Sequence, residues 1–583
     1  MRQLLYHLAR HGDISWLSFH FAKFIAAQSG MPIDDPLCLS AALLCEANQQ
    51  GSVCINLAEL GGKPMFHSNT IDATQIPLGE SPATWCERLR ANACVGGAGD
   101  AAPMTLDGNR LYLNRFWHYE DRIAAKIKQL LGDHGEPENP AACAAFDSMF
   151  GQATDIDGDQ RQAVLTAVNK AFSVISGGPG SGKTSTVVRI LSLLLALNPD
   201  LRIALAAPTG KAAARMLDSI RARIDTLDID ASIKHRFPSQ ARTLHRLLGV
   251  RRQGFEYNEQ HPLPFDCVIV DEASMVDLKL MYHLLTALPR QARLVLLGDR
   301  DQLASVAAGN VLGDITGHGL ALESGAPDLA AAIALLGSNY RFDKKTAIGE
   351  LARLVNQGQH DEALDLLRQN QRGLRRYVEQ PDRLNADALG WLYEAYQSIF
   401  DSDTPALALD SYDSTRVLCA TNRGPLGVDA LNRTISNAML ARNHLPETEL
   451  YQGLPIMITR NQHDLGLYNG DTGILWRFGN SLRACFRDAN QGIRDLSVNR
   501  LPGFTPAWAT SVHKSQGSEF DSVLLILPSD PNSEVLSREL LYTAVTRARR
   551  QFILHGSDLA ITSAIERLTQ RHSGLAQKLG WPD

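Results

Sequence analysis

One eight-residue segment constrains the fold of this chain more than any other, because it fits the phosphate-binding pattern G-x-x-x-x-G-K-[ST] at every defined position. The segment is Gly177-Gly178-Pro179-Gly180-Ser181-Gly182-Lys183-Thr184. The apolar run 172–176 before it predicts a buried strand, and residues 184–197 after it predict a helix with few polar side chains. An ordinary glycine turn is the alternative, but a glycine loop that leads into a helix N-terminus attracts anions. The segment therefore predicts a nucleoside triphosphate site, with Lys183 on the β- and γ-phosphates and the Thr184 hydroxyl on Mg²⁺.

The composition is that of a soluble globular protein. The 583 residues are 44% hydrophobic and 21% charged, which suits several domains. The net charge is −6, so contacts with nucleic acid would have to come from local basic grooves. No apolar run has the length of a membrane span, and no signal-peptide core is found near the N-terminus. The nine scattered cysteines include no C-x-x-C pair, which favours free thiols in a reducing cytoplasm over zinc or disulfides.

Short apolar strands alternate with helices in the middle of the chain, which predicts an α/β domain with a parallel sheet. Polar clusters follow three of these strands, at Thr209 to Lys211, at Asp271-Glu272 and at Asp299. Ligands of a parallel sheet bind at the carboxyl ends of its strands, so we expect these clusters to lie together. Composition and turn signals divide the chain into a helical N-terminal domain (1–110), a linker (111–149), a first α/β domain (150–335), a second α/β domain in two parts (336–429 and 506–583) and a β-rich insertion (430–505).

Asp271 and Glu272 directly follow the apolar run Val268-Ile269-Val270. An exposed acidic turn after a strand would look the same. Beside a phosphate-binding loop, however, such a pair predicts that Asp271 coordinates Mg²⁺ and that Glu272 orients and deprotonates the attacking water.

Three further side chains indicate a motor rather than a metabolic kinase. Gln302 follows another strand end and can sense the γ-phosphate. Arg341 and Arg547 lie in the second region, and arginines that stabilise phosphoryl-transfer charge often come from a neighbouring domain. Singly, each arginine is equally typical of a surface salt bridge. Together with the other motifs they predict a cleft that closes on ATP and opens on hydrolysis.

The ordered set of motifs resembles the superfamily 1 DNA helicases. Gln160 stands where that family has an adenine-reading glutamine. The matching motifs are Ala206 to Ala213, Thr243 to Gly249, Thr510 to Glu519 and Leu541 to Ala548. The resemblance implies two RecA-like P-loop NTPase domains, here called 1A and 2A, with ATP and Mg²⁺ as cofactors. It also implies that 430–505 is an SH3-like domain, called 2B.

More narrowly, the amino-acid sequences of these motifs are similar to those of the RecD family, the alpha chains of RecBCD-type helicase–nucleases. The likeness covers about 150–583 and extends more weakly to the N-terminal module. It implies RecB-like and RecC-like partners in a heterotrimer that acts on single- and double-stranded DNA ends. No nuclease cluster and no helix-hairpin-helix elements are found in the sequence, so the N-terminal module is interpreted as a docking surface for partners.

The family likeness also assigns contacts to single-stranded DNA, mostly to phosphates and sugars. The residues are Thr209, Lys211, Thr243, His245, Thr510 and His513. For His245 a satisfied histidine beside the sheet remains open, and for Lys211 a solvated lysine at a helix start. Residues 250–264 match the family's strand-separating 1B hairpin, with Phe255 or Tyr257 on the fork base, although an ordinary surface loop would have the same composition.

Three functions are compatible with these motifs. The chain is predicted to be a 5′ to 3′ helicase subunit, with polarity taken from the resemblance alone. A nucleotide-dependent regulatory subunit with little unwinding of its own, or an autonomous 5′ to 3′ helicase, are the alternatives. The complete motif set favours the first.

Overall fold

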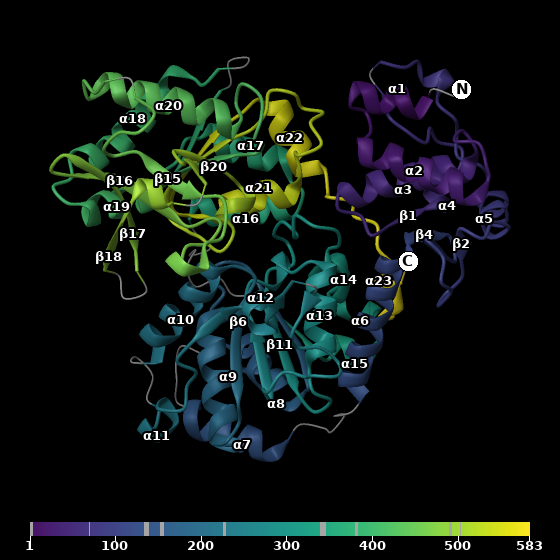
Figure 1. Cartoon of the computed structure of the whole chain (residues 1–583). Coiled ribbons are helices and arrows are strands. Elements are labelled where there is room, and N and C mark those ends of the chain that lie inside the picture. The colour runs from purple at the N-terminus through teal and green to yellow at the C-terminus, as the bar shows by residue number, and fades with distance from the viewer. Residues whose placement is uncertain are drawn as a thin grey trace.

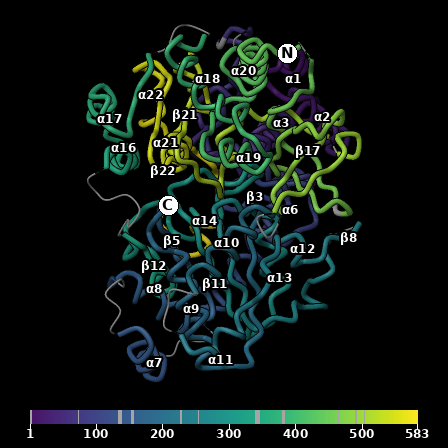
Figure 2. The backbone as a smooth tube through the Cα atoms, turned by 90° about the vertical axis from the view of Figure 1, so that its left-hand side faces the viewer, coloured from purple at the N-terminus to yellow at the C-terminus, as the bar shows by residue number. Residues whose placement is uncertain are grey.

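The computed structural model describes residues 4–68, 70–132, 139–151, 157–224, 229–252, 254–337, 346–378, 383–446, 448–488, 492–501 and 503–582. Its three main parts surround a common centre, with the first α/β domain below the second and the N-terminal region beside the second (Figures 1 and 2). Within the part of the chain described, every helix is too short or too polar to span a bilayer.

The N-terminal region is mostly helical, as predicted, and it also contains a small sheet. Its helices are α1 (Leu4–His11), α2 (Trp16–Ser29), α3 (Pro36–Gln49), α4 (Leu57–Leu60), α5 (Pro82–Arg90) and the 3-10 turn η1 (Ala73–Gln75). They pack on a four-stranded sheet of order β1-β4-β3-β2, made of β1 (Cys54–Asn56), β2 (Val95–Gly96), β3 (Met104–Asp107) and β4 (Arg110–Leu113). These strands were missed because they are only two to four residues long.

Residues 111–149 are not a linker. Helices α6 (Asn114–Gly132) and α7 (Pro140–Phe150) occupy most of this stretch. The buried side chains of α6, including Trp117, Ile123 and Ile127, belong to the core of the first α/β domain. Most of the Gly- and Pro-containing stretch that suggested a linker, residues 133–138, lies outside the described residues.

The first α/β domain contains a parallel sheet of order β12-β5-β11-β10-β6-β7, as predicted. Its strands are β5 (Phe172–Gly177), β6 (Ile203–Ala207), β7 (Ala241–Thr243), β10 (Cys267–Val270), β11 (Arg293–Gly298) and β12 (Ile333–Leu336). Its helices are α8 (Gly158–Asn169), α9 (Lys183–Leu197), α10 (Gly210–Ile224), α11 (Ala231–Lys234), α12 (Leu244–Leu248), α13 (Leu278–Ala287), α14 (Val311–Ile315) and α15 (Pro327–Ala330), with turns η2 (Ala273–Met275), η3 (Gly317–Gly319) and η4 (Leu322–Ser324). Apolar side chains of β5, β10 and β11 alternate between two cores, one shared with α6 and α13 and the other with α7, α8 and α9.

The second α/β domain has a five-stranded parallel sheet of order β13-β22-β21-β14-β20. Its strands are β13 (Leu374–Tyr377), β14 (Thr415–Cys419), β20 (Ala509–Ser511), β21 (Phe520–Ile526) and β22 (Ala548–His555). Its helices are α16 (Ala347–Asn356), α17 (His360–Arg368), α18 (Ala386–Phe400), α19 (Pro405–Ser414), α20 (Val428–Arg442), α21 (Arg538–Val545) and α22 (Asp558–Glu566), with turn η7 (His513–Ser515). The α/β class with two parallel-sheet domains is thereby confirmed.

The expected insertion is an antiparallel sheet of order β18-β17-β16-β15-β19. Its elements are β15 (Pro455–Ile458), η5 (His463–Leu465), β16 (Thr472–Phe478), β17 (Ser481–Arg487), β18 (Ile493–Ser497), η6 (Val498–Arg500) and β19 (Phe504–Pro506). The predicted turn Gly479-Asn480 joins β16 to β17, with Phe478 opposite Ser481. The insertion starts later than predicted, because residues 430–442 continue α20. The SH3-like classification stays a prediction.

The last residues of the chain do not stay in the second domain. From α22 they run back to the N-terminal region and the first domain and end with α23 (Leu575–Lys578), beside α6 and α14 (Figure 1). The predicted range 506–583 for the second domain therefore extends too far.

Candidate active site and nucleic-acid interface

The phosphate-binding loop has the predicted strand–loop–helix form. Strand β5 ends at Gly177, and α9 starts at Lys183. Gly180 and Gly182 have φ of 85° and 86°, a left-handed region that glycine enters without strain. At Gly177 a Cβ atom would lie 2.5 Å from Oγ of Ser181 and 2.9 Å from Cβ of Leu336, so a side chain is excluded there. The pattern therefore needs glycine for backbone shape and close packing.

Lys183 is held inside this loop. Its Nζ donates hydrogen bonds to the carbonyl oxygens of Gly177 and, at 3.1 Å, of Gly178. The ammonium group is thus fixed among backbone atoms at the start of α9, where free N–H groups also gather.

The two carboxylates follow β10 as predicted, and the N–H of Glu272 donates to Oδ1 of Asp271 at 2.9 Å. Glu272 has φ of 52°, an unusual backbone for a non-glycine residue and typical of functional sites. Burial and the neighbouring Glu272 raise the pKa of Asp271 to about 6, while Lys183 opposes that rise. A cation beside this buried carboxyl group would favour its charged form.

A cavity of about 540 Å³ brings the predicted ATP-site residues together. It is lined by Pro179, Gly180, Gly182, Lys183, Thr184, Asp271 and Glu272 of the first domain, by Gln302, and by Arg547 of the second. Gly177, Gly178, Ser181 and Gln160 are not among its lining residues, and Arg341 lies outside the described residues. The cavity therefore lies between both sheets, as a cleft that closes on nucleotide requires.

These residues fit a nucleotide bound with Mg²⁺. The glycine loop and Lys183 suit phosphate groups, and Oε1 of Gln302 is buried with no hydrogen-bond partner in the structure as described. No group of three or more His, Cys, Asp or Glu side chains within the described ranges could hold a metal by itself. Thr184 and Asp271, the residues predicted for Mg²⁺, both line the cavity, and their role as its ligands stays a prediction.

Gln302 is tied to the second domain. Its Nε2 donates to Oδ2 of Asp299 at 2.9 Å, and the Tyr542 hydroxyl donates to the same oxygen at 3.3 Å. Next to it, the N–H of Leu303 donates to Oγ1 of Thr543 at 2.9 Å, and Nε2 of Gln516 donates to the carbonyl of Leu303 at 2.6 Å. The glutamine loop is thus held by three bonds from 2A.

Arg547 is buried, and its guanidinium donates to the carbonyl oxygens of Thr543 at 3.1 Å and Ser518 at 3.2 Å. The sequence interpretation overlooked Arg215 of α10, which lines the same cavity and donates to the carbonyl of Gly517. Its position four residues after Lys211 places both on one side of α10. That spacing was the one available signal for Arg215.

Gln160 lies outside the cavity wall. It is 2% exposed, and its Oε1 accepts a 2.9 Å hydrogen bond from Nη1 of the buried Arg189. Asp157 caps the same helix by accepting from the Gln160 N–H at 2.8 Å. A role in reading adenine stays a prediction for Gln160.

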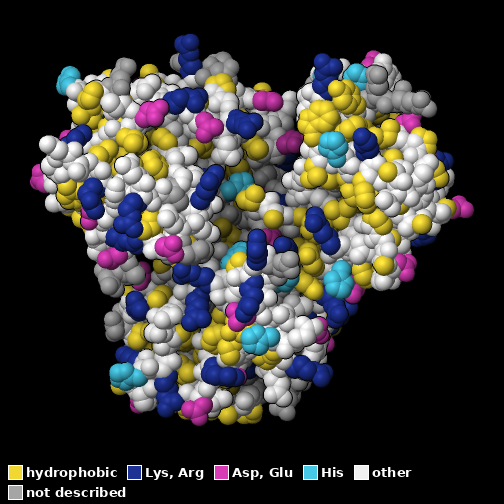
Figure 3. Space-filling view, in the orientation of Figure 1, with side chains coloured by type: hydrophobic (Ala, Val, Ile, Leu, Met, Phe, Trp, Pro, Cys, Tyr) yellow, Lys and Arg dark blue, Asp and Glu magenta, His cyan; other side chains and the backbone are white. Residues whose placement is uncertain are grey.

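A second, larger cavity of about 1220 Å³ lies between 1A, 2A and the inserted sheet. It contains the predicted residues Lys211 and Thr243. Its other basic lining residues are Arg215, Arg221, Arg242, Arg246, Arg487, Arg494 and Arg549. In Figure 3, Lys and Arg side chains gather where the domains meet. This excess of cations suits a phosphate backbone, although the whole chain is acidic.

The other predicted DNA residues do not line this cavity. Thr209 accepts from the Ala212 N–H at 3.2 Å and so caps α10. His245 is exposed, with its ring 5.9 Å from the Phe255 ring, and its contact with DNA stays a prediction. Thr510 is buried on β20, and burial lowers the pKa of His513, which is half-buried.

Lys211 is the predicted DNA residue with the most unusual environment. Burial lowers its pKa to about 8, the charge of Arg416 acts in the same direction, and Asp413 opposes them. An anion beside this ammonium group would favour its charged form.

Arg246 reaches across the second cavity and was also overlooked. Its Cζ lies 4.6 Å from the ring centroid of Tyr468, on the inserted sheet's side, and its guanidinium donates to the Tyr468 hydroxyl. Tyr468 also contacts Gly210, at 3.4 Å from where a Cβ atom would be. The inserted sheet therefore contacts 1A directly.

The predicted hairpin exists but is minimal, with β8 (Val250–Arg251) paired to β9 (Gly254–Phe255). The Phe255 ring lies 4.7 Å from His283, and Tyr257 stacks on His261 with ring centroids 4.9 Å apart. Both candidate fork residues are thus partly packed against their own domain, and the pin assignment stays a prediction.

Three domain families match the chain. They are the N-terminal domain of RecBCD enzyme subunit RecD over 10–112, the AAA domain over 160–308, and the UvrD-like helicase C-terminal domain over 506–555. RecBCD enzyme subunit RecD of Mycobacterium tuberculosis is 36% identical, covering 96% of this chain and 94% of its own length. That of Haemophilus influenzae is 31% identical and covers 99% of both. A Bacteroides Pif1 helicase bound to single-stranded DNA is 18% identical over 69% of this chain and 92% of its own, with a TM-score of 0.38.

The phosphate-loop cavity lies between two domains with parallel sheets, and residues 506–555 of the second domain match a UvrD-like helicase domain. These features define a superfamily 1 helicase motor driven by ATP. The likeness to RecD subunits at both ends and through the middle of the chain narrows that class. The chain belongs to the RecD family of RecBCD enzyme subunits.

Proposed function

We propose that this chain is the 5′ to 3′ motor subunit of a RecBCD-type helicase–nuclease, unwinding double-stranded DNA ends with partners similar to RecB and RecC. The observation that carries the proposal is the cavity between 1A and 2A, where Lys183, Glu272, Gln302 and Arg547 meet. A site built from two domains couples hydrolysis to their relative movement.

Each residue has a role in this proposal. Lys183 holds the β- and γ-phosphates, and Glu272 takes a proton from the attacking water. Gln302 contacts the γ-phosphate, while Arg547 stabilises the charge that develops on it. Thr184 and Asp271 would hold Mg²⁺, which when bound would neutralise charge on the phosphate oxygens.

The DNA path in this proposal includes the cavity lined by Lys211 and Thr243. Its basic side chains come from 1A, 2A and the inserted sheet, so a bound strand would contact all three. Such contacts hold the backbone without reading sequence.

The N-terminal region is proposed to dock on partner subunits. Tyr6, Trp16 and Phe24 of α1 and α2 are 43%, 47% and 48% exposed. Hydrophobic side chains gather on the visible face of this region in Figure 3. Exposed aromatic groups of this kind are typical of protein interfaces. The nine free cysteines support a cytoplasmic location.

Strand separation on duplexes with a 5′ tail, a 3′ tail or blunt ends tests the function, with the chain alone and after addition of its partners. We expect ATP-dependent unwinding from 5′ tails, and none with Lys183→Gln. Unwinding from 3′ tails only would overturn the polarity. ATPase without unwinding, even with partners present, would favour the regulatory alternative.

A further inference from the structure

The loop that follows Gln302 is held by a residue from the other end of the chain. Nη1 of Arg571 donates to the carbonyl oxygens of Ser305 at 2.6 Å, Ala307 at 3.2 Å and Gly309 at 3.1 Å. Inside the loop, Oγ of Ser305 donates to the carbonyls of Ala307 at 3.0 Å and Gly309 at 3.2 Å. One guanidinium thus donates to three carbonyl oxygens that accept no hydrogen bond from a helix or a sheet among the described residues.

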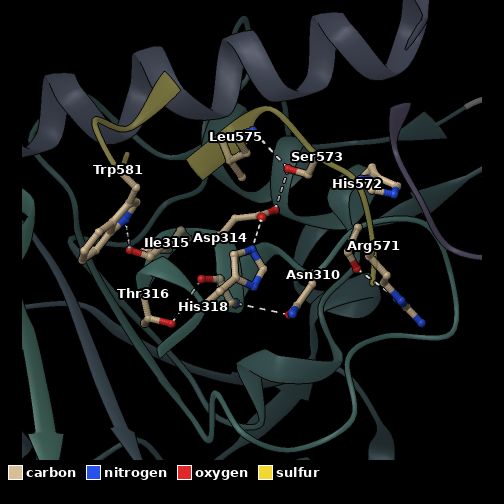
Figure 4. A network of polar contacts seen from close by, with 12 residues as sticks. Asn310, Asp314, Ile315, Thr316, His318, Arg571, His572, Ser573, Leu575 and Trp581 are labelled. Atoms are coloured by element: carbon tan, nitrogen blue, oxygen red, sulfur yellow. Dashed lines mark hydrogen bonds and ion pairs between the residues drawn. The ribbon is translucent and has the colours of Figure 1, made fainter. Parts of the chain in front are cut away.

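Arg571 lies on the segment that runs from α22 of the second domain back to the first domain. It lies five residues beyond α22, in a segment fixed on the near side by Thr569, whose Oγ1 donates to Glu539 of α21 at 2.8 Å. On the far side, Oγ of Ser573 donates to Oδ2 of Asp314 at 2.9 Å, and Nε1 of Trp581 donates to the carbonyl of Ile315 at 3.1 Å. Figure 4 shows this network, in which Asp314 also bonds His318. The segment is therefore anchored on both sides of Arg571.

The N-terminal region also contacts Arg571 and the loop that it holds. A Cβ atom at Gly51 would lie 2.9 Å from Cζ of Arg571, so the guanidinium packs on a bare backbone. The Gly309 N–H donates to the Gly51 carbonyl at 2.9 Å. The His572 carbonyl accepts from the N–H groups of Val53 at 2.8 Å and Cys54 at 3.2 Å. Arg571 therefore lies where 1A, 2A and the N-terminal region meet.

We propose that Arg571 is a positioning residue for ATP hydrolysis, which fixes loop 305–309 and through it Gln302, and which links both to the N-terminal region. Only two residues separate Gln302 from Ser305, so a displaced loop displaces the glutamine amide. A partner docked on the N-terminal region would act on the ATP site through Gly51 and Arg571. The inference rests on the proposed ATP-driven motor.

The test compares Arg571→Ala with Arg571→Lys and with Arg567→Ala in the full chain. Arg567 is the matched control, because its Nη1 also donates to a backbone carbonyl, that of Ser533 at 2.6 Å, but within the second domain. DNA-stimulated ATPase is measured with single-stranded DNA and Mg²⁺-ATP. We expect Arg571→Ala to lower kcat by about tenfold to a hundredfold with KM for ATP nearly unchanged, since small misplacements of a catalytic group have effects of this size. Arg571→Lys should recover part of kcat, and Arg567→Ala should keep it.

An unchanged kcat in Arg571→Ala would overturn the proposal, as would an equal loss in Arg567→Ala. Thermal unfolding of each variant separates misplacement from unfolding, and a loss of kcat that follows the melting temperature across the variants would also overturn it. The wild-type and Lys183→Gln chains show independently whether the motor hydrolyses ATP. If the proposed function is wrong, the wild-type chain itself will show no DNA-stimulated ATPase. If only this inference is wrong, Arg571→Ala will hydrolyse ATP as fast as the wild-type chain.

Discussion

The Tyr542 hydroxyl, in the second α/β domain, donates a 3.3 Å hydrogen bond to Oδ2 of Asp299 in the first. Since the same oxygen accepts from Nε2 of Gln302, one carboxylate joins Gln302, the proposed γ-phosphate sensor, to the opposite domain. The tyrosine also lies against the phosphate loop, where a Cβ atom at Gly178 would be 2.8 Å from its hydroxyl oxygen. Burial, followed by the charges of Asp299 and Asp301, raises the pKa of Tyr542, so the group remains a donor.

Tyr542→Phe should lower kcat of the DNA-stimulated ATPase by roughly tenfold to a hundredfold, because a hydrogen bond to a charged group contributes about 1.5–3 kcal/mol. KM for ATP should change little. Tyr396→Phe is the control, since its hydroxyl donates to the Trp508 carbonyl at 2.7 Å inside the second domain. An equal kcat for Tyr542→Phe and the wild-type chain would show that this hydrogen bond does not link Gln302 to the second domain in hydrolysis.

Glu272→Gln should bind ATP and DNA but hydrolyse ATP about 10²–10⁴ times more slowly, because the amide cannot accept the proton of water. Glutamine has nearly the same size and shape as glutamate, so the positive φ of 52° at this position should be tolerated equally by both residues. Single-turnover hydrolysis and nucleotide binding are the measurements. Asp277→Asn provides a control, since Asp277 caps α13 by accepting from the Leu280 N–H and does not line the cavity. Rapid ATP hydrolysis by Glu272→Gln would show that another residue is the general base.

DNA affinity should fall as the pH rises through about 8, the pKa to which burial lowers Lys211. A phosphate group binds the charged ammonium, so above this pH binding requires proton uptake and weakens by at most about tenfold per pH unit. Lys211→Arg should bind without this dependence, because guanidinium stays protonated. Titrations of labelled single-stranded DNA from pH 7 to 9 measure it. A parallel pH dependence in Lys211→Arg would assign the effect to another group.

Trp16→Glu should weaken assembly with the partner subunits without changing the ATPase of the isolated chain. A charge placed among exposed aromatic side chains has to be desolvated on docking. Leu559→Glu, at a residue that is 68% exposed on α22, is the matched control. Co-purification of the complex is the measurement, and intact assembly in Trp16→Glu would place the docking surface elsewhere.

Much of the site could be predicted because its signals are local. Gly177 to Thr184 specify the loop mainly through local backbone conformations, such as the positive φ of Gly180 and Gly182. The strand before Asp271 and the turn Gly479-Asn480 are local in the same sense. Residues 111–149 were misread as a linker because Gly and Pro are typical of linkers, and local composition does not record that α6 packs into the core of the first domain.

Contacts across the chain depended on the tertiary structure. The sequence by itself determined the phosphate loop, the acidic pair and the alternation of strands and helices, because propensity and spacing act over a few residues. Only the folded chain decided that Arg215 and Tyr542 reach the ATP site, and that Arg571 returns to the loop after Gln302. These neighbours are far apart in sequence and meet because several apolar cores pack together, and no local pattern records which surfaces that packing brings into contact.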